Sequence, residues 1–120
     1  MATEKRLTLK FTLDKGGLLL ELDGTKSESF SGTNSQTYRK TVTTSWTAID
    51  VSMLASVDMI MLKNEDATNF VQVALDNAGA KIFSKITAGR SIFLCGEPTA
   101  TYYYKADTAS CDVSVSACEP

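Results

Sequence analysis

Apolar and polar residues alternate along most of this chain. From Leu7 to Leu13 every second residue is leucine or phenylalanine, and leucines recur at positions 18, 20 and 22. A period of two is typical of strands that bury one face. Because the turn-forming segment Asp14 to Gly17 separates the two runs, the pattern predicts an opening β-hairpin.

The segment that follows is polar. Residues 23–35 combine glycines, an asparagine and several serines, which predicts a long loop. Thr37 to Thr44 is rich in β-branched residues and is expected to form a strand. Further along, Asp50 to Ser56 is expected to hold at most one helical turn, capped by Asp50 or Ser52, because the segment is too short for a core helix.

Turn signals divide the remaining chain at regular intervals. Turns are expected at 64–66, 76–79, 87–89 and 96–98, and strands at 57–63, 70–75, 81–86, 90–95, 101–106 and 111–118. Alternation assigns their faces: Val71, Val73 and Leu75 together; Ile82 and Ile86 opposite Phe83; and Cys111, Val113, Val115 and Ala117 inward. Eight or nine short strands at this spacing indicate an all-β sandwich or barrel. We expect residues 1–120 to form a single antiparallel β-sandwich domain, with its long polar loop at 23–35.

The composition agrees with a small folded domain. A chain of 120 residues with 43% hydrophobic and 22% charged residues fits one core. A formal charge of −2 argues against a nucleic-acid partner, which would require a basic face. Lys10 interrupts the only apolar stretch near the N-terminus, so neither a signal peptide nor a membrane partner is expected.

No motif in the sequence indicates catalysis or a cofactor. The chain has no histidine, which removes every mechanism that needs an imidazole base. Patterns for activated serines and for phosphate-binding glycine loops are absent too. Loop oxygens at Asn64–Asp66, Asn69 and Asp76–Asn77 could ligate calcium, but turn formation is the favoured role. We expect no enzymatic activity, no cofactor and no metal.

The three cysteines do not form a metal-binding pattern. If residues 111–118 form one strand, Cys111 and Cys118 lie on opposite faces and cannot bridge. A bond from Cys95 to either of them stays open from the sequence. The favoured interpretation is that all three are small buried residues in a reducing compartment.

Four aromatic residues are candidates for an interface with a partner. Tyr102 and Tyr104 would share one face of a strand while Tyr103 faces the other way, so at least one ring could reach the surface. The alternative is that these rings close the core and pack on an edge. Phe30 is an aromatic residue within the polar loop, where a partner could cover it, or it could pack on its own domain.

The C-terminal half resembles small virion proteins of tailed bacteriophages. The similarity is carried by a strand–turn–strand segment, Leu62 to Val71, by Ile86 to Leu94, and by the ending from Tyr103 to Val113. Proteins of this group are β-sandwiches, often jelly-roll-like, and they are not enzymes. The resemblance implies a structural component of the virion, made in the bacterial cytoplasm.

Within that group, a capsid decoration or auxiliary (cement) protein is the first hypothesis. Its partner would be the major capsid protein or another virion protein, and it would act as a homo-oligomer. The alternatives are a tail, neck or fibre-base component and a carbohydrate-binding receptor-recognition module. Particle copy number would separate decoration, with hundreds of copies, from a tail or tip role with a handful.

Overall fold

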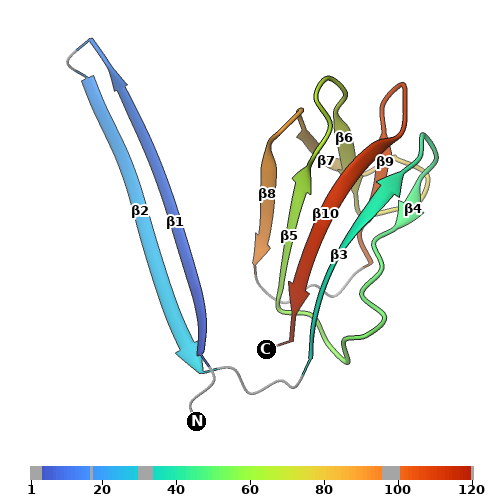
Figure 1. Ribbon diagram of the computed structural model, residues 1–120, viewed down its shortest axis with the longest axis horizontal. Coiled ribbons are helices and arrows are strands. Elements are labelled where there is room, and N and C mark those ends of the chain that lie inside the picture. The colour runs from blue at the N-terminus through green and yellow to red at the C-terminus, as the bar shows by residue number, and fades with distance from the viewer. Residues whose placement is uncertain (1–3, 17, 30–33, 96–100, 120) are drawn as a thin grey trace. The chain divides into compact units, whose positions relative to one another are not determined.

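The computed structural model describes residues 4–16, 18–29, 34–95 and 101–119. Over these residues the chain is built from antiparallel strands and contains no helix, so the expected all-β class is confirmed (Figure 1). The chain divides into two compact units, residues 1–31 and residues 32–120, where the sequence analysis expected one domain.

The first unit is a β-hairpin. Strands β1 (Glu4–Lys15) and β2 (Leu18–Ser29) pair without interruption from Glu4↔Ser29 to Lys15↔Leu18. Gly16 takes a φ of 58° between them, a conformation that glycine adopts without strain. The predicted hairpin is thus present.

The polar loop predicted at 23–35 is wrong over residues 23–29, which belong to β2. The local composition of this segment disfavours a strand. Pairing with β1 overrides that preference, because every residue from Asp23 to Ser29 has a partner across the ribbon.

The second unit contains two four-stranded antiparallel sheets. The first sheet has the order β3 (Ser35–Val42), β10 (Cys111–Cys118), β5 (Met59–Asn64) and β8 (Ser91–Cys95). The second has the order β4 (Thr47–Ala48), β9 (Tyr103–Ala106), β6 (Val71–Ala74) and β7 (Ile82–Ile86). The described residues thus form ten strands, against the eight or nine expected. The sequence pattern missed β4, because two residues are too few to show a period.

The strand pairs of this unit are nested along the chain. β3 pairs with β10, β4 with β9, β5 with β8 and β6 with β7. Two further pairings, β10 with β5 and β6 with β9, join these pairs into the two sheets. The four strands β3 to β6 therefore pair with the four strands β10 to β7, in that order.

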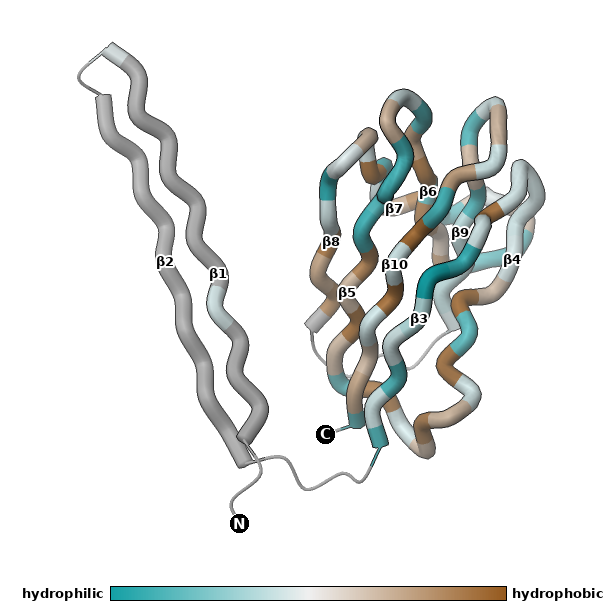
Figure 2. Tube along the Cα trace, in the orientation of Figure 1, coloured by the Kyte–Doolittle hydropathy of each residue, from teal (hydrophilic) through white to brown (hydrophobic). Residues whose placement is uncertain are grey.

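One hydrophobic core is shared by the two sheets. β10 supplies the inward residues predicted for it, Cys111, Val113, Val115 and Ala117, all buried. The second sheet supplies Val71, Val73, Tyr104 and Ala106. Figure 2 shows the resulting alternation of apolar and polar residues along β10. Each fully buried Val or Leu contributes roughly 1.5–3 kcal/mol relative to an exposed one, so this core is the main source of the unit's stability.

Two local predictions need correction. Leu75 was expected on the same face as Val71 and Val73, but it is 43% exposed, while Ala74, expected on the opposite face, is buried. The register shifts at this point: Val73 pairs with Ser84 and Ala74 with Ile82, so Phe83 is skipped as in a β-bulge and the strict alternation ends. The same irregularity leaves Ile82 44% exposed.

The segment from Asp50 to Ser56 forms no helix. It holds one turn, in which the Leu54 amide donates to the Val51 carbonyl at 3.0 Å. Asp50 caps this turn as predicted, because its Oδ1 accepts the Ser52 amide at 2.9 Å.

A buried carboxylate fastens the end of β10 to the start of β3. Glu119 is 5% exposed. Its Oε1 accepts the Ala55 amide at 2.8 Å, and its two oxygens accept the side-chain and backbone N–H groups of Asn34, both at 3.2 Å. These bonds satisfy the carboxylate inside the protein, as a buried charge requires.

Candidate interaction surface

The three consecutive tyrosines have different environments. Tyr104 pairs with Val73 and Thr47 in the second sheet and is 0% exposed. It belongs to the core, so its assignment as an interface candidate is wrong. Tyr102 and Tyr103 are half-buried. Phe30, the fourth candidate, lies outside the described residues.

Tyr102 lies beside the exposed residues of the bulge. Its ring meets Phe83 edge-on, with centroids 5.8 Å apart and an interplanar angle of 61°. Phe83 is 42% exposed, and the neighbouring Leu75 amide donates to the Lys81 carbonyl, next to Ile82. We call Leu75, Ile82, Phe83 and Tyr102 the bulge patch. Partly exposed aromatic and aliphatic groups at one strand end are typical of protein contact surfaces.

Sequence analysis identified only Tyr102 of this patch. Strict alternation was expected to place Leu75 on the face of Val71 and Val73. The register shift that skips Phe83 lies beside it, and no glycine or proline at these positions signals that shift.

On the outer face of the second sheet, two aromatic rings are covered by lysines. Lys85 Nζ lies 3.8 Å from the centroid of the Phe70 ring, and Lys105 Nζ lies 5.4 Å from that of Trp46. Gln72 pairs with both lysines across the sheet. Each cation–π contact therefore occupies one face of its ring, and a stacking ligand would have to displace the lysine from that face.

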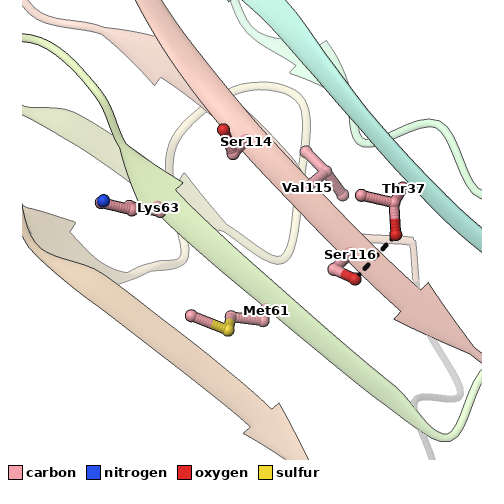
Figure 3. Close-up of a pocket in the computed structure, with 6 residues that line it drawn as sticks. All are labelled: Thr37, Met61, Lys63, Ser114, Val115 and Ser116. Atoms are coloured by element: carbon pink, nitrogen blue, oxygen red, sulfur yellow. Dashed lines mark hydrogen bonds between the residues drawn. The ribbon is translucent and has the colours of Figure 1, made fainter.

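The outer face of the first sheet carries a shallow hollow. Its volume is about 140 Å³, and Figure 3 shows its lining residues on three adjacent strands: Thr37, Met61, Lys63, Ser114, Val115 and Ser116. The outward residues of β10 are short, so the strand forms the floor between longer neighbours. Met61, which lines one side of the hollow, is 40% exposed.

Polar groups around this hollow are bonded to one another. Thr37 and Ser116 hydroxyls share a hydrogen bond of 3.0 Å, and Ser114 donates to Glu65 at 3.0 Å. Farther along, Asp112 accepts hydrogen bonds from Thr41 and Arg39. Such exposed pairs contribute little stability individually. Because these hydroxyl groups are paired with other side chains, the exposed lining of the hollow is mainly apolar.

The loop carboxylates that could have ligated calcium serve as turn acceptors. Asp66 Oδ2 accepts the backbone amides of Thr68 and Asn69 at 2.9 and 2.6 Å, and these bonds lower the pKa of its carboxyl group. Asp76 accepts the amides of Ala80 and Lys81 in the same way. The favoured turn-forming role is confirmed for both. Among the described residues, no group of three or more acidic or cysteine side chains could hold a metal ion.

The cysteines occupy one sheet. Cys111 is buried, and burial raises the pKa of its thiol. Cys118 alternates to the opposite face of β10, as predicted. Cys95 and Cys118 both pair with Met59, one from each side, so their Cα atoms are roughly 10 Å apart, beyond disulfide reach.

Two tyrosine hydroxyls, of the half-buried Tyr38 and the buried Tyr104, lie near the start of the Asp50 turn. Tyr38 donates to the Asp50 carbonyl at 2.6 Å. The Tyr104 hydroxyl is buried, with no hydrogen-bond partner in the described part of the chain. Burial is the main cause that raises the pKa of both phenols, and the charge of Asp50 adds to it.

Stability is therefore expected to fall at alkaline pH. A phenol whose folded-state pKa is raised above 10.0 stabilises the fold fully below that pH and loses this contribution as the pH rises above it. The free energy of unfolding should drop by up to about 1.4 kcal/mol per pH unit for each tyrosine. Urea unfolding followed by Trp46 fluorescence, between about pH 8 and pH 11, measures this slope.

The matched variant is Tyr38→Phe/Tyr104→Phe, which removes both phenols. Its unfolding free energy should depend less on pH above about pH 10 than that of the natural chain. Identical slopes would show that other groups cause the alkaline loss.

Comparison with known proteins returned no relatives. No protein-family model matches the chain. No curated protein and no solved structure matches it. The part of the chain that the structure describes contains no helix that could span a membrane.

Proposed function

We propose that this chain is a non-enzymatic structural component of a tailed-bacteriophage virion, acting as a capsid decoration or cement protein. It would bind the major capsid protein as a homo-oligomer and stabilise the assembled shell. The proposal joins two arguments: the resemblance of the C-terminal half to small virion proteins, and the nested strand pairing of the larger unit.

The nested pairing is the observation that carries the proposal. Four pairs, β3·β10, β4·β9, β5·β8 and β6·β7, follow one another inward along the chain. Rolling such a ladder into two four-stranded sheets gives a jelly-roll sandwich. This architecture recurs in viral capsid domains and in lectin domains, and it supports a role in the particle.

The bulge patch is suited to binding another protein of the particle. It offers Phe83 and Tyr102 as aromatic anchors and Leu75 and Ile82 as aliphatic surroundings. A docked partner would bury these groups and gain hydrophobic stabilisation. Because a shell presents the same site many times, modest contacts would add up through multivalency.

A second particle role and a sugar-binding role are kept as alternatives. A tail, neck or fibre-base position would use the same fold with few copies. A carbohydrate-binding module needs open aromatic faces, whereas Lys85 and Lys105 cover the rings of Phe70 and Trp46. That contact makes the sugar-binding alternative the weaker one.

The proposal is tested on purified particles of the phage that encodes this chain. Quantitative gel analysis should find hundreds of copies per particle for a decoration protein. A handful of copies would contradict decoration and favour a tail or tip position.

The patch is tested by rebinding to shells stripped of this protein. Phe83→Asp places a charge in the bulge patch and should lower occupancy at least tenfold at a fixed concentration. Ser110→Asp adds the same charge on an exposed loop and should bind like the natural chain. Equal binding by both variants would exclude the bulge patch as the contact.

A further inference from the structure

The pairing register divides the N-terminal hairpin into two unlike faces. Directly opposite residues of an antiparallel pair lie on the same face. One face therefore combines Leu7, Leu9, Phe11 and Leu13 of β1 with Leu18, Leu20 and Leu22 of β2. The other face combines Thr8 with Thr25, Lys10 with Asp23, and Thr12 with Glu21.

The leucine face requires a cover that the hairpin itself does not contain. An isolated two-stranded ribbon is marginally stable in water, and three or more strands or a second layer are needed to bury an apolar face. Residues 1–31, which contain the hairpin, form one of the two compact units of the chain. A ribbon of two 12-residue strands presents a face about 40 Å long and 10 Å wide.

We infer that the leucine faces of hairpins from different copies of this chain pack on one another and hold the protein as a homo-oligomer. Two ribbons stacked about 10 Å apart would make a small two-layer sandwich, the least structure that buries such a face. The inference supplies the interface for the homo-oligomer of the proposed function and rests on that part of it.

The charges on the leucine face favour a second copy as the occupant. On β1 this face carries no charged residue from Leu7 to Leu13, and on β2 its positions Leu20, Leu22 and Gly24 are uncharged. Lys26 lies directly opposite Leu7, with Lys5 and Glu28 beyond it, and Lys15 stands at the other end. Two such faces can therefore meet over their centre without burying a charge, which would otherwise cost several kcal/mol.

The area of the leucine face sets the expected strength of self-association. Each face covers roughly 400 Å², so a stacked pair covers about 800 Å², below the roughly 1,200–2,000 Å² of stable complexes. We therefore expect a reversible association whose extent depends on concentration, with room for more than two ribbons around a common axis.

The test is the oligomeric state of the full chain, measured by sedimentation over a wide range of concentration. Phe11→Asp puts a charge at the centre of the leucine face and should weaken self-association at least a hundredfold. Thr8→Asp puts the same charge on the opposite face, at an exposed position paired with Thr25, and should associate like the natural chain. Phe11→Ala removes the ring without adding charge and should weaken association about tenfold.

Two results would overturn the inference. The natural chain could be monomeric at every concentration, which would also remove the homo-oligomer from the proposed function. Alternatively, it could be oligomeric but equally so in all three variants, which would reject the hairpin interface and leave the homo-oligomer standing. Circular dichroism of each variant checks that strand content is retained, and Phe11→Ala keeps the test decisive if Phe11→Asp loses the hairpin.

Discussion

Replacing Asn64 with leucine is expected to lower the free energy of unfolding by about 3–5 kcal/mol, a large part of the stability of a domain this size. Asn64 ends β5 and is 0% exposed. Its Nδ2 donates to the carbonyls of Asn69 and Ile86 at 2.8 and 3.0 Å, and its Oδ1 accepts the Asp66 amide at 3.0 Å. Leucine has a similar branched shape but makes none of these bonds.

The loss is large because the partners are backbone groups that no other side chain replaces. Unpaired buried donors and acceptors cost roughly 1–3 kcal/mol each. The backbone of Asn64 also joins the two turns, accepting the Gly89 amide and donating to the Arg90 carbonyl. Once the side-chain bonds are lost, only these two backbone hydrogen bonds, among those of the described residues, still join the turn after β5 to the turn after β7.

Asn69→Ala is the matched control. Its side chain makes one exposed hydrogen bond, from Thr108, and its backbone carbonyl still accepts from Asn64. We expect a loss within about 1 kcal/mol. Urea unfolding followed by Trp46 fluorescence compares the two variants, and equal losses would contradict the role given to Asn64.

Gly79→Ala is the second change with a large expected effect, about 2–5 kcal/mol of destabilisation. Gly79 has a φ of 72°, a left-handed conformation that costs alanine energy. A Cβ built there would also lie 2.5 Å from Trp46 Nε1 and 2.8 Å from two ring carbons. The indole is flat and rigid, so either the turn or the ring must move.

Gly89→Ala separates the two causes. Gly89 has the same φ of 72°, but a Cβ there meets nothing within 4 Å. We expect only the backbone cost, about 1–2 kcal/mol. Because Trp46 is the only tryptophan, its emission should change in Gly79→Ala and stay unchanged in Gly89→Ala. Equal destabilisation, with no change in emission, would show that the indole does not pack on this turn.

The alternation of apolar and polar residues was enough to predict the strands that have one apolar face and one polar face. The inward and outward residues of β10 were predicted residue by residue, because a strand with one buried face needs a strict period of two. The opening hairpin was predicted for the same reason and from its glycine turn. The full length of β2 was not, since its second half has weak strand propensity and is held by pairing with β1.

The candidate surface was predicted only in part, for two physical reasons. Tyr104 was proposed as a contact residue, yet its pairing between Val73 and Thr47 places it in the core. Which face of a sheet becomes buried depends on the second sheet, and local sequence does not determine it. Leu75 and Ile82 were missed because they are exposed beside a register shift that no sequence signal indicates. Phe83 lies on the face opposite Ile86, as alternation indicated, but was not recognised as a contact residue.

The most direct test of the central claim is a density map of the intact phage particle. We expect the map to show a body of two four-stranded sheets, repeated over the outer surface of the shell, with the bulge patch against the major capsid protein. A map in which this chain is absent from the shell would contradict the decoration role.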